Sequence, residues 1–418
     1  MHLESREAAQ LAQAIGLGSF GKSMAKRAQA LINHELLVWA RKNAGLTVDQ
    51  AAQKAGVTEE RLLLWESGAE RPTINQLRKL AQSYKRPIAV FYLPKPPRDF
   101  QPLRDYRRLA AVTREPGSPG LLLEVRRAWA RREIALELYR DLDEKPPQIS
   151  LTARITDDAE ALALKIREEF GATREIQSGL GSEHKALNWW RSALEAHGIL
   201  VFQAVGVEVS EMRGFSITER PLPIVVVNIK DSPRARIFSV LHEFVHVAIR
   251  QGGICDLDED AHLDPDEQEV EVFCNRVAGA TLVPASELFR EELVLERHGQ
   301  ASSWSDEEIS WLSRRYWVSQ EVLLRRLLIC SLITKEFYQE KRAELSARRR
   351  PRSEGFVPPA QMAISTTGHA FIRLVLDNYY RENITSSQVA DFLNINLKHV
   401  GEIEQRVMGH NLLFGAVA

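Results

Sequence analysis

The sequence is that of a globular protein with more than one domain. Its 418 residues include 55 Lys+Arg and 56 Asp+Glu, 44% are apolar, and the formal net charge is −1. A chain of this length exceeds the size at which one hydrophobic core stops growing, and its apolar content excludes a disordered protein. A net charge near zero excludes a general attraction to nucleic acid or anionic lipid, so any such binding must depend on local patches.

The sequence predicts a cytoplasmic protein without membrane association. No apolar run approaches the roughly 18 residues of a membrane-spanning helix, and the first residues lack the basic-then-apolar pattern of a secretory signal. Three cysteines, Cys255, Cys274 and Cys330, are too few for a disulfide framework and fit a reducing compartment. We expect Cys274 and Cys330 to be core residues.

Residues 1–95 are predicted to form a compact set of short helices. We expect these helices over residues 33–43, 47–55, 58–66 and 73–84. Each of the last three ranges begins with Thr, whose hydroxyl accepts a hydrogen bond from an otherwise unpaired N–H at a helix start. The segment is locally basic, with 14 Lys+Arg against 8 Asp+Glu. A proline-rich joint at 93–97 ends it, because proline cannot continue a helix.

The middle of the chain is predicted to be mainly helical around a small sheet. Two runs rich in β-branched or aromatic residues, 200–202 and 224–229, are expected to be strands. We expect the second to lie at an edge of the sheet, where an extended peptide could pair with it. Helices return over residues 232–341.

The end of the chain is predicted to be a separate helical segment. A basic linker at 348–352 precedes it, and Thr385-Ser-Ser-Gln388 has the spacing of a helix capping box. The expected fold class is therefore α+β, mainly α with a small β-sheet. The expected domains cover residues 1–95, 96–345 and 355–418.

The motif His242-Glu-Phe-Val-His246 is the strongest chemical signal in the sequence. Ser232-Pro233 is a typical helix start and Gly252-Gly253 a helix stop, so the motif is expected inside a helix of about 18 residues. The i,i+4 spacing places both imidazoles on one face of that helix. Two imidazoles so placed suit Zn²⁺, and Glu243 is positioned to activate a water molecule.

A catalytic zinc site needs a third protein ligand. An acidic stretch, Asp256–Glu271, follows the motif and leads into an amphipathic helix. Glu267, Glu269 and Glu271 are all candidates, and periodicity does not choose between them. The alternative interpretation is that all three carboxylates lie at a solvated helix start, where they complement the helix dipole.

These motifs resemble those of the ImmA/IrrE metallopeptidases. That family has a strand, a helix with H-E-x-x-H and a second helix reading E-x-x-A-N-x-(F/V)-A before a proline. Here the second helix reads Glu271-Val-Phe-Cys-Asn-Arg-Val-Ala278, with Cys274 in place of alanine, and Arg213-Gly-Phe-Ser-Ile217 precedes the strand. The resemblance covers about residues 190–335. It implies a zincin-like zinc endopeptidase in which Glu271 is the third ligand and Glu243 the proton acceptor. Mn²⁺ is a candidate metal in vitro besides Zn²⁺.

Cys255 is a candidate inhibitory fourth ligand. It lies in the loop after Gly252-Gly253, a few residues beyond His246. A thiolate there could take the position of the reacting water and hold the enzyme latent. The alternative interpretation is a loop residue without a role.

Residues 35–93 resemble the XRE-type helix-turn-helix domains of phage repressors. The resemblance rests on Gly45-Leu-Thr47, Gly56-Val-Thr58 and Trp65-Glu-Ser-Gly68, with apolar residues at the core positions between them. Residues 86–94 and 105–107 also resemble the long branch of the peptidase family, in which a helix-turn-helix domain is fused to the peptidase.

Sequence-specific DNA reading is a separate question for this domain. The helix that would enter the major groove carries Glu59, Glu60 and two leucines where base-reading side chains are usual. Lys54 and Arg61 remain as candidates for contact with the DNA backbone. Weak DNA contact and a protein-docking or sensing role are both consistent with the sequence. The last segment resembles a degenerate helix-turn-helix, for dimerisation or docking, or is a helical hairpin that only packs on the chain.

The resemblance implies a regulatory zinc endopeptidase that cleaves a transcriptional repressor, itself a helix-turn-helix protein, in a stress or DNA-damage response. One branch of the family acts beside CBASS anti-phage operons with single-stranded DNA as a stimulus, and this order of domains suits it. Single-stranded or duplex DNA and a second copy of the chain are further candidate partners. The alternatives are a DNA-binding XRE-type regulator or antitoxin whose peptidase fold is a sensor, and cleavage of the chain's own domain joint.

Overall fold

A computed structural model describes residues 29–86, 88–96, 104–105, 118–255, 265–297, 304–347 and 357–409. The chain divides into two compact units, one formed by residues 1–99 and the other by residues 100–418. None of the helices in the described ranges combines the length and the apolar content needed to cross a membrane.

The first unit consists of short helices that start where the sequence predicts. They are α2 (His34–Asn43), α3 (Val48–Ala55), α4 (Glu59–Glu66), α5 (Ile74–Ser83) and the 3₁₀ helix η1 (Ile88–Tyr92). Thr47, Thr58 and Thr73 each cap the helix that follows, with the hydroxyl accepting a backbone N–H three residues on. The predicted positions of α2–α5 are thus confirmed.

One buried ion pair fixes α2 against α4. The Arg41 guanidinium donates to both carboxylate oxygens of Glu66, with Nε–Oε1 2.7 Å and Nη2–Oε2 2.9 Å. Leu62 and Trp65, on the same side of α4, lie in the core of the unit with Leu36. A bidentate pair adds geometric specificity, so α4 has one defined inner face.

A five-stranded sheet forms the centre of the second unit. Its strands are β1 (Arg104–Asp105), β2 (Leu200–Ala204), β3 (Gly214–Ile217), β4 (Ile224–Asn228) and β5 (Gly253–Cys255). The order is β1-β5-β3-β4-β2, in which β3 runs antiparallel to β4 and β5. The two strands predicted from the sequence are confirmed as β2 and β4. The expectation that residues 224–229 form an edge is wrong, because β4 is paired on both sides.

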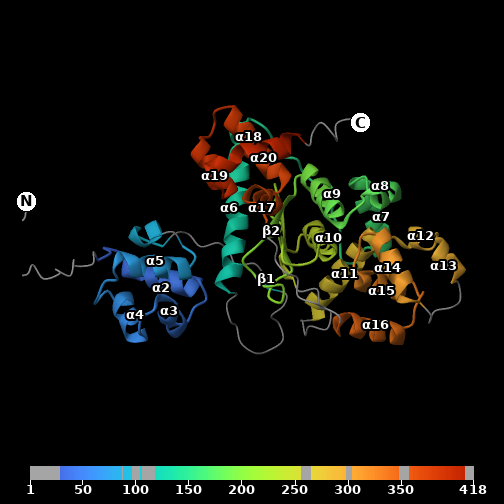
Figure 1. Cartoon of the computed structure of the whole chain (residues 1–418), viewed down its shortest axis with the longest axis horizontal. Helices are drawn as coiled ribbons and strands as arrows, with labels where there is room; N and C mark the ends of the chain where they lie inside the picture. The colour runs from blue at the N-terminus through green and yellow to red at the C-terminus, as the bar shows by residue number, and fades with distance from the viewer. Residues whose placement is uncertain are drawn as a thin grey trace, which may run out of the picture. The chain divides into compact units, whose positions relative to one another are not determined.

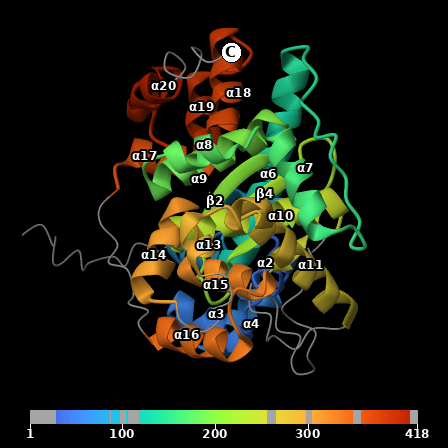
Figure 2. The same ribbon diagram turned by 90° about the vertical axis from the view of Figure 1, so that its right-hand side faces the viewer.

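A group of helices shares one core on one side of the sheet, and one of these helices carries the histidine motif. They are α7 (Ala159–Glu169), α8 (Arg174–Gly179), α9 (Glu183–Ala196), α10 (Pro233–Ile249), α11 (Pro265–Leu282), α12 (Ala285–Leu288), α13 (Glu292–Glu296), α14 (Asp306–Arg315), α15 (Gln320–Ile329) and α16 (Lys335–Ala347). Figure 2 shows α9, α10 and α11 as neighbours in this layer. Val225 and Val227 of β4 point into it.

The opposite face of the sheet is covered by α6 and the C-terminal helices, which lie beside one another in Figure 1. These helices are α6 (Pro119–Asp141), α17 (Pro359–Thr367), α18 (His369–Tyr380), α19 (Ser386–Leu393) and α20 (Val400–Gly409), with η2 (Leu397–His399). Ile224 and Val226 of β4 point into this second core. Alternate residues of one strand therefore enter different cores, which explains why β4 reads as a continuous apolar run. The α+β class, mainly α with a small sheet, is confirmed.

Candidate metal centre

Helix α10 carries the histidine motif and has a well-defined start. The Ser232 hydroxyl accepts the N–H of Ala235, and Pro233 occupies the first helical position. The predicted stop at Gly252-Gly253 is wrong by a few residues, because Arg250 ends the helix with φ 59°. Gly252 instead allows close approach to β3, since a Cβ there would stand 2.7 Å from the carbonyl oxygen of Ser216.

Three side chains from α10 and α11 meet in the interior. Nε2 of His242 lies 3.2 Å from Nε2 of His246. The Glu271 carboxylate is 3.2 Å from each of these nitrogens, through Oε2 to His242 and Oε1 to His246. Ligand atoms bound at about 2.0–2.1 Å to one tetrahedral ion stand roughly 3.3 Å apart. The three residues can therefore hold a metal ion with little rearrangement.

The surroundings of the two histidines suit this role. Nδ1 of His246 lies 2.9 Å from the carbonyl oxygen of Gln251, which fixes the proton on Nδ1, so that the lone pair of Nε2 faces the cluster and can bind a metal. Burial alone would raise the pKa of Glu271, but the two adjacent imidazoles hold it below its usual value. The carboxylate is thus ready to bind a cation.

Glu243 points toward β3, next to this cluster. A Cβ on Gly214 would stand 2.7 Å from its Oε1, and the Ser216 hydroxyl lies on the same face of the strand. The side chain is 1% exposed. Burial raises the pKa of Glu243 to about 7, against the opposing effect of the two histidines. A carboxylate with a pKa near neutrality is suited to accept and return a proton.

The structure distinguishes between the three glutamates that the sequence left open. Glu271 joins the histidines, Glu269 is exposed on α11, and Glu267 is half-buried outside the cluster.

Two of the cysteines singled out in the sequence differ in what the structure describes of them. Cys274 is buried in the core, where its thiol interacts with His246 and burial raises its pKa. The side chain of Cys255 lies outside the described residues, although its backbone pairs with Gly214.

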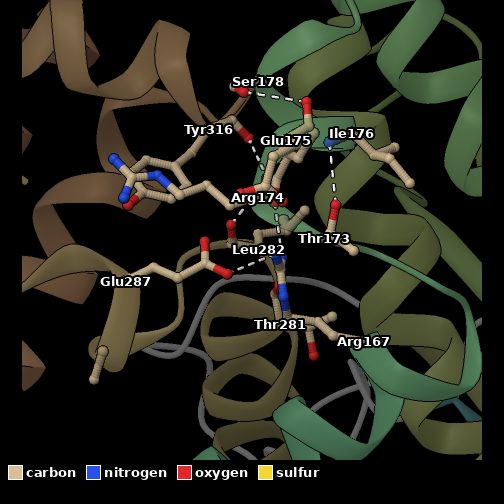
Figure 3. Close-up of polar contacts among 12 residues, drawn as sticks. Arg167, Thr173, Arg174, Glu175, Ile176, Ser178, Thr281, Leu282, Glu287 and Tyr316 are labelled. Carbon is tan, nitrogen blue, oxygen red and sulfur yellow. Dashed lines mark hydrogen bonds and ion pairs between the residues drawn. The ribbon is translucent and has the colours of Figure 1, made fainter. Parts of the chain in front are cut away.

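A polar network anchors the C-terminal end of α11, the helix that carries Glu271 (Figure 3). The buried Arg167 guanidinium donates to the carbonyl of Thr281 and to Oε1 of Glu287, both at 2.9 Å. The amide of Gln177 donates to the carbonyl of Leu282 at 3.0 Å. These bonds satisfy carbonyls at the helix end that lack partners within the helix, and so fix α11 against α7 and α8. Sequence patterns gave no signal of this network.

The two candidate DNA contacts lie on the surface of the first unit. Lys54 is exposed near the end of α3, and Arg61 is exposed in the first turns of α4. Nε of Arg61 lies 3.9 Å from Oε2 of Glu70. One of the two cations is therefore already beside a carboxylate of its own domain.

Two parts of the chain match known families. Residues 194–328 match the IrrE N-terminal-like domain (Peptidase_M78), and residues 37–91 match a helix-turn-helix domain. No curated protein matches the chain. The resemblances expected from the sequence are confirmed over these residues, and the first of them points to a metallopeptidase.

Proposed function

We propose that the protein is a zinc endopeptidase in which His242, His246 and Glu271 hold the metal and Glu243 transfers the proton. The carrying observation is the buried cluster of two imidazoles and a carboxylate, with a second carboxylate beside it. Zinc is the proposed metal because it prefers such nitrogen and oxygen ligands in tetrahedral sites. When bound, it would polarise the scissile carbonyl and make water a stronger acid.

The chain's own residues would carry the proton and fix the geometry. Glu243 would accept a proton from the attacking water and return it to the leaving amine. Gly214 leaves room for that carboxylate, and Gln251 holds the ring of His246 in one orientation. Arg167 would hold α11, and with it Glu271, in a fixed position against α7.

The proposed substrate is a transcriptional repressor with a helix-turn-helix domain, cleaved in a stress or anti-phage response. Support comes from the joint presence of a peptidase domain and a helix-turn-helix domain in one chain. The proposed site of action is the cytoplasm. Cleavage of the domain joint in the same chain is a further outcome that the assay below detects.

Incubation with purified candidate repressors tests this function. Unaltered protein and Glu243→Gln are compared with Zn²⁺ or Mn²⁺, in the presence and absence of single-stranded DNA, and products are identified by mass spectrometry. We expect cleavage by the unaltered, zinc-loaded protein only. Absence of cleavage of any repressor, or of the chain itself, under all conditions would refute the proposal.

A further inference from the structure

The outer face of α4 combines exposed leucines with carboxylates. Leu63 and Leu64 are 49% and 41% exposed. Glu60, Leu63, Leu64 and Ser67 follow the i, i+3, i+4, i+7 spacing, so they form one stripe on the side of the helix opposite Leu62 and Trp65. A helix that is apolar on its exposed side as well as its buried side is a typical docking element.

The distribution of charge in the first unit disfavours DNA binding by α3 and α4. Residues 1–95 hold 14 Lys+Arg against 8 Asp+Glu. Residues 48–70, which include α3 and α4, hold 2 of those cations, Lys54 and Arg61, and 5 of those acids. This segment is therefore net negative by 3, or by 2 without the buried Glu66 that Arg41 neutralises, although the region around it is basic.

The exposed carboxylates lie where DNA phosphates would approach. Glu59 and Glu60 occupy the first turn of α4, so they neutralise the positive end of the helix dipole that would otherwise attract an anion. Arg61 is partly neutralised by Glu70. Leucine side chains cannot read the donor and acceptor pattern of base edges. The face is thus suited to the opposite partner, one that presents cations around an apolar strip.

We propose that the outer face of α4 binds a basic, amphipathic helical surface of a protein partner, such as the DNA-contacting surface of a DNA-binding protein. The leucines would bury against the partner's apolar strip, and Glu59 and Glu60 would pair with its lysines or arginines. This interaction needs neither the metal cluster nor Glu243. It would supply a means of selecting substrates that is separate from the peptidase site.

The test uses the full chain with Glu243→Gln, so that a bound probe is not cut. The probes are a fluorescein-labelled helical peptide with lysines on one face and leucines on the other, an equally charged peptide with serines in place of leucines, and duplex DNA. Binding is measured by fluorescence anisotropy at two salt concentrations. We expect the lysine–leucine peptide to bind at least tenfold more tightly than either of the other probes.

Variants locate the binding face. Leu63→Ser/Leu64→Ser and Glu59→Lys/Glu60→Lys should each weaken peptide binding at least tenfold, about 1.4 kcal/mol, without loss of folding because all four side chains are exposed. The matched control is α13, which also exposes one leucine between two glutamates: Leu295→Ser and Glu292→Lys/Glu296→Lys should change nothing. Equal weakening by the control variants, no peptide binding, or tighter binding of duplex DNA than of the peptide would overturn the proposal. Each of these results is independent of whether the chain cleaves repressors.

Discussion

Gly214 lies so close to Glu243 that no side chain fits between them. A Cβ on Gly214 would stand 2.7 Å from Oε1 of Glu243, 3.0 Å from its Cγ and 3.1 Å from the carbonyl oxygen of Val226. Contact with strand β3 therefore fixes the position of this carboxylate. Burial among the side chains of α10 would not be enough to fix it. Because β3 pairs with β4, the backbone of Val226 also limits the space at Gly214.

Gly214→Ala should displace Glu243 and spare the metal cluster. We expect cleavage to fall by about a hundredfold, because a misplacement of about 1 Å has an effect of that order, while zinc affinity stays unchanged. Activity and zinc titration are measured on the same preparation. The control is Gly401→Ala, at a helical glycine where a Cβ meets nothing within 4 Å. Loss of zinc in Gly214→Ala would show that the glycine acts on the cluster as a whole.

Gly368→Ala should loosen the C-terminal helices from β2. Gly368 has φ 83°, and a Cβ there would stand 2.9 Å from the carbonyl of Val201 and closer still to Glu195. Both the backbone conformation and the clash disfavour alanine, so we expect a loss of about 2–4 kcal/mol in the free energy of unfolding. Urea denaturation measures it. Gly401→Ala, at an open helical position, should not destabilise the protein, and a Gly368→Ala variant as stable as the unaltered protein would contradict the contact.

Glu195 should make the stability of the second unit depend on pH. Its carboxylate accepts the N–H of Ala370 at the start of α18, and burial raises its pKa above the usual 4.5, against the opposing charge of Arg191. The folded state therefore holds the proton more tightly than the unfolded state. The stability that this group contributes is complete below about pH 4.5 and is lost as the pH rises through the folded-state pKa.

The comparison of unaltered protein with Glu195→Gln isolates this effect. The variant does not titrate at this position, so the unfolding free energy of the unaltered protein minus that of the variant should decrease as the pH rises above about 4.5. Urea denaturation across this range provides the difference. A difference that is constant or that increases with pH is the result that our account forbids.

Arg167→Met should destabilise the protein more than the neighbouring change Arg174→Met. Arg167 is 5% exposed and its loss leaves the buried oxygen of Gln177 and the carbonyl of Thr281 without a donor. We expect a cost of about 3–5 kcal/mol. Arg174 is 33% exposed, and its partner Glu291 keeps Arg315 at 2.9 Å, so its loss should cost less than about 1 kcal/mol. Thermal denaturation of both variants measures the two losses in stability. Equal losses would argue against the role of Arg167 in anchoring α11.

Local sequence signals predicted the elements better than their packing. The threonine caps located α3–α5, and the spacing of His242 and His246 placed both on one face of α10. The short strands β1, β3 and β5 were not predicted, because two to four residues carry too little periodic pattern and pair through the backbone. Glu271 could not be separated from Glu269 by periodicity, since the choice depends on how α11 is rotated against α10.

The packing of the C-terminal helices also escaped the sequence. Residue pattern predicted the capping box at Thr385, which is present, but not the contact of α17 with β2. That contact combines the packing of Ala360 and Ala363 in the same core as β2 with polar bonds across a long separation, such as the amide of Gln203 donating to the carbonyl of Ser365 at 2.6 Å. Such a bond has no signature in either local segment.

Zinc titration of three proteins tests the central assignment most directly. Unaltered chain, Glu271→Gln and Glu243→Gln are stripped with a chelator and titrated with Zn²⁺ by calorimetry, with elemental analysis of the metal retained. We predict that the unaltered chain and Glu243→Gln each bind one zinc with similar affinity, and that Glu271→Gln binds it about a hundredfold or more weakly. Full zinc affinity in Glu271→Gln, or loss of zinc in Glu243→Gln, would contradict the assignment of ligands and proton acceptor.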